Sequence, residues 1–364
     1  MSADRAGALT ATRATLAEVA ERAGVSVSTV SKVLNGRNGV SEDTRARVEA
    51  LLADQQYNPR NPGPNHAPLI EVLCFEIDSS WASEALAAIE GVARRRGVGV
   101  VVSGTSDRQK PDAGWMEGVL NRRPVGVLLV ASNLLAEQMQ QLRSRNIPFV
   151  VLGPAGDVPA DVPTIGSADW NGAYAAARHL VDLGHREVAV ISGPGDMMAA
   201  TARLSGYRAA LEGAGLSLRP EHLRRGEFHH EDGIVQGREL LSLPRPPTAV
   251  LASSDVQALG VYEAARALGV AVPAQLSVIG FDDIKVARWA GPALTTVRVP
   301  IADMAARAVE LVLAVRAGQV PPLTRIDLAT TLVVRDSTAP PPPPSPRAKL
   351  SNSPKKLDAQ KVRK

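Results

Sequence analysis

From residue 69 to residue 293 the chain alternates short β-branched runs with amphipathic stretches of helical period, and this alternation restricts the fold more than any other feature. Strands that alternate with helices form parallel sheets covered on both faces. We predict strands at 69–75, 98–103, 125–131, 148–152, 187–192, 248–252 and 276–280. We predict helices at 82–96, 134–145, 170–183, 203–213, 231–241, 255–268 and 301–316. Two similar α/β lobes are therefore expected, 69–165 and 166–293, and residues 294–335 add one helix and one strand.

Residues 15–59 predict three short helices instead. In the first helix, apolar side chains recur at helical spacing; they are Leu16, Val19, Ala20 and Ala23. Gly24 ends that helix, because only glycine adopts the left-handed conformation without steric cost. Ser26 caps a second helix, Val27 to Asn35, by accepting from the N–H of Ser28 or Thr29. Ser41 caps a third, which contributes the apolar side chains Val48, Leu51 and Leu52. Two helices joined by a tight glycine turn are the sequence form of a helix-turn-helix, although spacing alone fits any small helical subdomain equally well.

The second helix has one apolar and one polar face. We expect Val30, Val33 and Leu34 to be buried, and Val27, Ser28, Ser31 and Lys32 to face outward. Lys32 can donate to guanine O6 or N7, Ser28 can donate or accept, and Val27 can contact a thymine methyl. Hydroxyls near the helix start are better suited to phosphates, which position a protein without specifying a sequence; these are Ser26, Thr29 and Ser31.

The order of residues is more specific than their spacing. The run LAEVAERAGVSVSTVSKVLN, followed by VSEDTRARVEALLADQQYNP, closely resembles the headpiece of the LacI/GalR family of bacterial transcription regulators. The later runs LVDLGHREVAVISGP, ARLSGYRAALEGAGL, GVYEAARALGVAVPAQLSVIGFDD and ARWAGPALTTVRVP resemble the core of the same family, which is shaped like a periplasmic sugar-binding protein. The resemblance implies a homodimer on a palindromic double-stranded operator, with the second helix in the major groove. It also implies that the chain crosses between lobes near 165, 295 and 322, and that an effector binds between them.

The family's effector contacts are carried over position by position. Arg203 matches an arginine that hydrogen-bonds the ligand, and Asp282 matches its carboxylate partner for ligand hydroxyls. Phe228 occupies the position of an aromatic that packs on the ligand ring, and Ser254 stands where many members carry Asn. Asp78 and Trp81 would contribute from the other lobe. The alternatives are a surface ion pair for Arg203 and Asp282, and core filling for Phe228 and Trp81.

Two stretches depart from simple expectations. Gly153 stands where many members place an aspartate that contacts ligand hydroxyls, which indicates a different hydroxyl pattern or a larger ligand. The run FHHEDG at 228–233 contains four residues that can bind metal, but adjacent residues point in different directions and acids are explained by a helix start. No nucleophile–base–orienter set is evident, so we expect no enzyme, no metal and no cofactor.

The remaining segments read as connections. Residues 1–14 form a flexible leader, 60–68 a Pro-rich linker, 69–338 the two-lobed core and 339–364 a disordered basic tail. The tail holds seven Lys or Arg against one Asp, so residues 1–338 carry a net charge of −2 although the whole chain carries +4. The pI is therefore no evidence that the body binds nucleic acid. Family members follow the headpiece with a short helix that places leucines in the minor groove. Proline and glycine oppose that helix here, leaving Arg60 as the strong minor-groove contact.

We therefore expect a small all-α headpiece joined to an α/β core, acting in the cytoplasm as a repressor of carbohydrate genes that a sugar releases from DNA. A single cysteine, Cys74, fits a reducing compartment and a buried position, and neither a signal peptide nor a membrane-spanning stretch is evident. A purine-responsive regulator and an activator remain alternatives. A solute-binding protein is the alternative from another class, which the attached headpiece and the missing signal peptide oppose.

Overall fold

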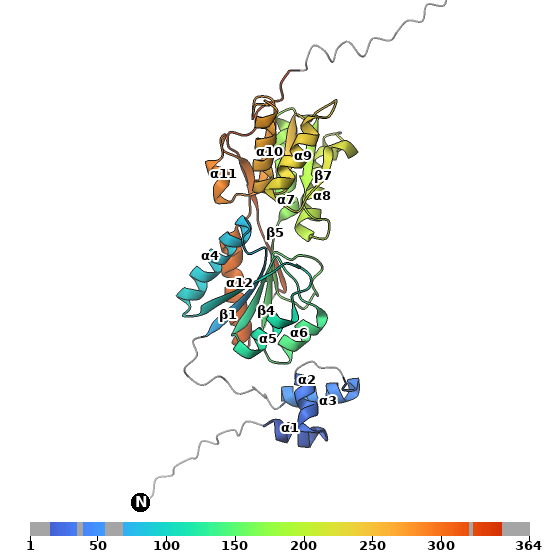
Figure 1. Ribbon diagram of the computed structural model, residues 1–364, viewed down its shortest axis with the longest axis vertical. Coiled ribbons are helices and arrows are strands. Elements are labelled where there is room, and N and C mark those ends of the chain that lie inside the picture. Colours follow the sequence, from blue (N-terminus) through green and yellow to red (C-terminus); the bar gives the residue numbers. More distant parts are fainter. Residues whose placement is uncertain (1–14, 35–38, 55–67, 320–322, 344–364) are drawn as a thin grey trace, which may run out of the picture. The chain divides into compact units, whose positions relative to one another are not determined.

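In the computed structural model, which describes residues 15–34, 39–54, 68–319 and 323–343, the N-terminal region forms three helices (Figure 1). They are α1 (Leu16–Ala23), α2 (Val27–Leu34) and α3 (Glu42–Asp54). Thr15 and Glu18 form a capping box at the start of α1: the Thr15 hydroxyl accepts from the Glu18 N–H at 3.3 Å, and the Thr15 N–H donates to the Glu18 carboxylate. Gly24, at φ +63°, ends α1 as predicted. The three helices share a small core of Val19, Ala20, Ala23, Val30, Val33 and Val48.

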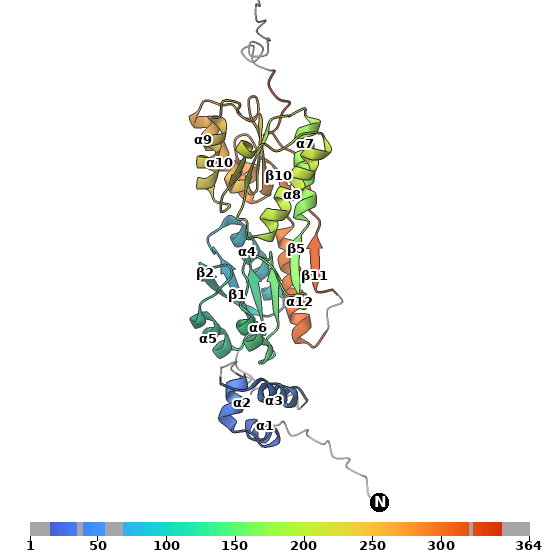
Figure 2. The same cartoon turned by 90° about the vertical axis from the view of Figure 1, so that its right-hand side faces the viewer.

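The rest of the chain divides into two compact units. The first contains the residues up to Asn171, together with Pro194–Ala202 and Arg298–Thr331. The second contains Gly172–Gly193, Arg203–Val297 and the residues from Leu332 onward. Each unit is built on one six-stranded sheet, and helices cover both faces of each sheet (Figures 1 and 2). The predicted fold class, a headpiece with a two-lobed α/β core, is confirmed.

The first sheet is parallel throughout, in the order β11-β5-β4-β3-β1-β2. Its strands are β1 (Leu69–Phe75), β2 (Gly99–Thr105), β3 (Gly126–Val130), β4 (Phe149–Leu152), β5 (Thr164–Ser167) and β11 (Arg325–Leu328). Its helices are α4 (Ser80–Arg95), α5 (Ala113–Arg122), α6 (Ala136–Arg143) and α12 (Ile301–Arg316). Helices α4 and α12 lie on one face and α5 and α6 on the other (Figure 1). Strand β1 is buried almost from end to end, and burial raises the pKa of the Cys74 thiol to about 12, which confirms a buried, unreactive cysteine.

The second sheet has the order β12-β10-β9-β8-β6-β7. Its strands are β6 (Val188–Ser192), β7 (Leu223–Arg225), β8 (Ala249–Ala252), β9 (Ser277–Asp282), β10 (Thr295–Arg298) and β12 (Thr331–Val333). Its helices are α7 (Asp169–Asp182), α8 (Met198–Gly213), α9 (His230–Leu241), α10 (Asp255–Ala267) and the short α11 (Lys285–Trp289), with a 3-10 turn at Pro220–His222. Helices α7 and α8 lie on one face of this sheet and α9 and α10 on the other (Figure 2).

The structure differs from the sequence prediction in several elements. Helix α5 was not predicted because Gly114 and Gly118 lower its helix propensity, yet Trp115, Met116 and Val119 bury its inner face. Helix α11 and strand β7 have five and three residues, too few to show a period. Residues 294–335 supply three strands and one helix, so the prediction of a single strand there is wrong.

The points at which the chain passes between units also differ. The first unit extends to Asn171 rather than 165, because the unpredicted strand β5 pairs with β4. The last passage lies at residue 331 rather than 322, because β11 pairs with β5 before the chain leaves the first sheet. At the other end, Ala339 is hydrogen-bonded to Ser277 through its N–H (3.0 Å) and its carbonyl (3.0 Å). The bonded chain thus runs past 338, and residues 344–364 of the expected tail lie outside the described residues.

Within the described residues, no helix is both long enough and apolar enough to cross a lipid bilayer.

Candidate functional site

Helix α2 presents the face that the sequence predicts. Val30 and Val33 are buried, whereas Val27 is 47% exposed and Ser28 and Lys32 are exposed. Ser31 differs from the expectation, since it is half-buried. The exposed face therefore offers one cation, one hydroxyl and one apolar side chain within two turns of helix.

Three hydroxyls gather at the start of α2. The Ser26 hydroxyl accepts from the Thr29 N–H at 3.1 Å, which confirms the N-cap and selects Thr29 over Ser28 as the donor. The same oxygen lies 2.8 Å from Ser28 Oγ and 2.9 Å from Thr29 Oγ1. Hydroxyls at the positive end of a helix dipole are suited to a phosphate group. Arg60, the remaining DNA contact expected from the sequence, lies outside the described residues.

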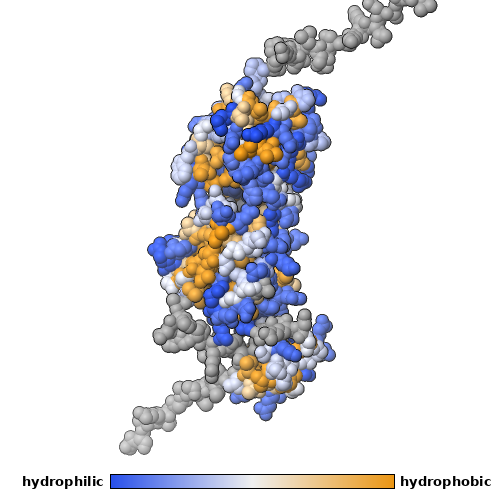
Figure 3. All heavy atoms as spheres, in the orientation of Figure 1, coloured by the Kyte–Doolittle hydropathy of each residue, from blue (hydrophilic) through white to orange (hydrophobic). Residues whose placement is uncertain are grey.

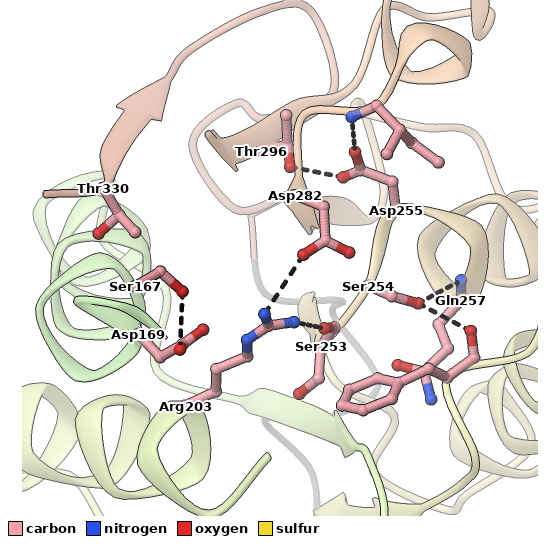
Figure 4. A network of polar contacts seen from close by, with 12 residues as sticks. Ser167, Asp169, Arg203, Ser253, Ser254, Asp255, Gln257, Asp282, Thr296 and Thr330 are labelled. Atoms are coloured by element: carbon pink, nitrogen blue, oxygen red, sulfur yellow. Dashed lines mark hydrogen bonds and ion pairs between the residues drawn. The ribbon is translucent and has the colours of Figure 1, made fainter. Parts of the chain in front are cut away.

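In the second unit, Arg203 and Asp282 form an ion pair at the carboxyl edge of the sheet (Figure 4). Arg203 Nη2 lies 3.3 Å from Asp282 Oδ1, and the two side chains are only 7% and 8% exposed. Arg203 Nη1 also donates to the Ser253 carbonyl at 2.5 Å. The Arg203 guanidinium stacks on the Phe281 ring at 3.8 Å from its centroid. The alternative of an ordinary surface ion pair is therefore wrong, because this pair is buried.

Asp255, the first residue of α10, supports that edge from below. Its carboxylate accepts from Thr296 Oγ1 and from the Ile284 N–H at 2.9 Å (Figure 4). Burial, followed by the charge of Asp282, raises the pKa of the Asp255 carboxyl well above its usual value. Gly280 makes room for it, because a Cβ there would lie 2.3 Å from Asp255 Oδ1. The sequence analysis did not single out Asp255, although an acid in the first turn of a helix after a strand was the available signal.

Phe228 and Ser254 are bonded to one another. Phe228 has a φ of +69°, a left-handed conformation that costs a non-glycine residue free energy. Its carbonyl accepts from Ser254 Oγ at 3.0 Å, and the same hydroxyl caps α10 by accepting from the Gln257 N–H at 3.1 Å. The Phe228 ring lies directly against Gly193, where a Cβ would be 2.1 Å from the ring. Phe228 is half-buried rather than part of the core, so the structure brings four predicted residues, Arg203, Phe228, Ser254 and Asp282, to one sheet edge.

In the first unit, Trp81 and Gly153 are in contact. Trp81, near the start of α4, is half-buried, and its ring lies 3.0 Å from the position a Cβ would take at Gly153. Gly153 also has a φ of +64°. An aspartate at 153 would require the Trp81 ring to move, which is a physical reason for the departure noted in the sequence. Asp78, three residues before Trp81, is exposed.

The acidic and histidine residues at 228–233 begin helix α9. Asp232 Oδ2 accepts from the N–H groups of Glu227 at 2.6 Å and His229 at 3.1 Å, as an acid does in the first turn of a helix. In the part of the chain that the structure describes, no group of three or more His, Cys, Asp or Glu side chains could hold a metal ion.

Comparison with known protein families separates the same two parts. Residues 15–60 match the domain of bacterial regulatory proteins of the lacI family. Residues 177–338 match the periplasmic binding protein-like domain.

Whole-chain comparisons agree. The HTH-type transcriptional repressor CytR of Escherichia coli (strain K12) is 33% identical over 312 residues, which cover 85% of this chain and 91% of that protein. The HTH-type transcriptional repressor PurR of Proteus mirabilis (strain HI4320) is 34% identical, covering 79% and 86%. Among solved structures, the transcriptional regulator CelR–cellobiose complex matches with a TM-score of 0.67 and 30% identity, over 89% of this chain and 100% of that one. The lac repressor dimer bound to operator and the anti-inducer ONPF matches with 0.66 and 28%, over 90% and 100%. Since such identity extends through headpiece and core alike, the chain belongs to the LacI family of bacterial regulatory proteins.

Proposed function

We propose that this protein is a repressor that binds a palindromic operator as a homodimer and releases it when a sugar binds its core. The observation that carries the proposal is the buried Arg203–Asp282 pair at the carboxyl edge of the second sheet, where open α/β folds bind ligands. A guanidinium and a carboxylate together can donate to and accept from the hydroxyls of a sugar. The similar regulator CelR was solved with cellobiose, which supports a carbohydrate effector.

Helix α2 is the proposed reading element. Val27, Ser28 and Lys32 contact base edges in the major groove, and the hydroxyls of Ser26, Thr29 and Ser31 contact phosphates. Arg60 adds a minor-groove contact. The similar lac repressor was solved as a dimer on operator, which supports the homodimer. Hydrophobic side chains also gather on the surface around α4 (Figure 3), a feature that suits a partner subunit.

The effector site includes Arg203, Phe228, Ser254 and Asp282, and we propose that Asp78 and Trp81 contribute to it as well. Phe228 packs on the face of the ligand ring. A purine is the second candidate effector, because the same aromatic ring would stack on a flat base. The protein acts on DNA in the cytoplasm and is not an enzyme.

The test is release of operator DNA by a sugar. A ligand shifts the equilibrium only through its different affinity for the two states, and Arg203 and Asp282 supply that difference. Arg203→Ala and Asp282→Ala should therefore bind operator about as well as the wild type but no longer release it. The matched control is Arg178→Ala, which breaks an exposed pair with Asp182 in the same unit and should release normally. Normal release by Arg203→Ala at the wild-type sugar concentration would show that the effector binds elsewhere.

A further inference from the structure

Two serine hydroxyls lie side by side at the carboxyl edge of the second sheet. Ser192 is the last residue of β6 and Ser253 follows β8; Ile191 pairs with Ala252, and the Ser253 N–H donates to the Ile191 carbonyl at 2.9 Å. Side chains alternate between the faces of a sheet. Ile191 and Ala252 belong to the core packed under α9 and α10, so Ser192 and Ser253 point to the opposite face, which α7 and α8 cover.

These hydroxyls are buried without hydrogen-bond partners. Ser192 is 1% exposed and Ser253 is 0% exposed, and neither Oγ is bonded to any group in the described residues. Gln257 approaches the same strand end: its Nε2 donates to the Ser192 carbonyl at 3.4 Å, and its buried Oε1 also has no partner there. Buried polar groups without partners are costly, and native proteins keep them where a ligand or water completes the bonding.

The charges beside the serines are already balanced. Arg203 donates to the Ser253 carbonyl, and its positive charge is opposed by Asp282 at 3.3 Å (Figure 4). Its guanidinium face is covered by Phe281. A charged ligand group placed here would unbalance a buried ion pair and would itself lose hydration. A hydroxyl, by contrast, can donate to one serine and accept from the other without any change in charge.

We propose that Ser192 and Ser253 together hold one hydroxyl of an uncharged, polyhydroxylated effector, and that phosphorylated sugars are rejected at this site. The inference rests on the proposed function and adds the charge class of the effector and the residues that select it.

The probes are D-glucose, D-ribose and cellobiose, each added to the full-length protein, with D-glucose 6-phosphate and D-ribose 5-phosphate as the charged counterparts. Melting temperature and release of operator are measured. An uncharged probe should raise the melting temperature and release DNA, and its phosphate ester should do neither. Ser192→Ala and Ser253→Ala should weaken the response to the active probe on the order of ten- to a hundredfold.

Ser277→Ala is the matched control. Ser277 is also 0% exposed, but it begins β9 at the opposite edge of the same sheet, and its hydroxyl donates to the Ala339 carbonyl at 3.0 Å. Its replacement should lower the melting temperature of the unliganded protein and leave the probe affinity unchanged. Replacement of Ser192 or Ser253 should leave that melting temperature unchanged or raise it, because no hydrogen bond is lost.

The outcomes separate the two proposals. If a phosphate ester releases operator better than its uncharged counterpart, or if both serine variants respond like the wild type, this inference is overturned and the proposed function stands. A fall in unliganded melting temperature for Ser192→Ala as large as that for Ser277→Ala would also overturn it, since the hydroxyl would then be bonded without a ligand. If no probe of either kind releases operator from the wild type, the proposed sugar effector itself fails.

Discussion

At the scale of the residue, His185 makes the stability of the second unit depend on pH. It is 1% exposed, with Nδ1 2.9 Å from Thr248 Oγ1 and Nε2 2.9 Å from the Ala339 carbonyl. Burial lowers the pKa of His185 below the usual 6.5. The unfolded chain therefore binds more protons just below pH 6.5, and the free energy of unfolding should fall as pH decreases through that value.

We expect His185→Gln to remove much of this dependence. Urea unfolding at pH 7.5 and 5.5 measures it, and each unit of pKa shift corresponds to about 1.4 kcal/mol. Asp255 acts in the opposite direction, because its raised pKa favours the protonated form in the folded state. The difference between wild type and variant isolates the histidine, and equal pH dependence in both proteins would contradict the prediction.

A second residue-scale prediction concerns Lys32. Because it is exposed on α2 and can donate to guanine, Lys32→Ala should weaken binding to the specific operator by about 1–3 kcal/mol. Binding to random DNA should weaken much less. Arg47→Ala, which removes an exposed charge from α3, is the control and should affect both DNAs equally. Fluorescence anisotropy with both duplexes decides, and equal losses for Lys32→Ala would assign it to phosphate.

At the scale of the element, α9 and α10 pack through two glycines. A Cβ at Gly233 would lie 2.0 Å from the Gln257 carbonyl, and one at Gly260 would lie 2.2 Å from the His230 carbonyl. Gly233→Ala should therefore lower the free energy of unfolding by about 1–3 kcal/mol or more, because backbone must move. Gly213→Ala, at the end of α8 with nothing within 4 Å, should instead raise it by roughly 0.5–1 kcal/mol. Urea titration of both variants checks the contrast, and a stabilised Gly233→Ala would refute the close helix contact.

At the scale of the whole molecule, the linker decides how the headpieces meet DNA. Pro62, Gly63 and Pro64 lie outside the described residues, and the prediction comes from their sequence alone. A proline costs a helix about 3 kcal/mol and a glycine about 1, so no hinge helix should form and no apolar wedge should unstack the operator centre. The operator should be bent little in a circular-permutation gel shift, and Arg60→Ala should weaken binding. A central kink of about 40° or more would contradict an extended linker.

The long, strongly patterned elements were predictable and the short ones were not. Strand β1 shows an apolar run bounded by proline and polar residues, so its limits were predicted to the residue. Strand β7, with three residues, and β5, with two of four residues Thr and Gly, carry too little local signal and exist because neighbouring strands offer hydrogen bonds. In the candidate site, the order of residues identified Arg203 and Asp282, whereas Ser192 and Ser253 have no sequence signature. Their partnership comes from the register of β6 with β8.

The sequence by itself determined the headpiece, the strand–helix alternation and the family, because caps, periodicity and residue order are properties of neighbouring residues. Only the tertiary structure decided that Arg203 and Asp282 are buried together, that Asp255 lies against Gly280, and that two hydroxyls without partners meet at one strand edge. Those facts depend on segments 50 and more residues apart, and burial and charge balance arise only when such segments pack.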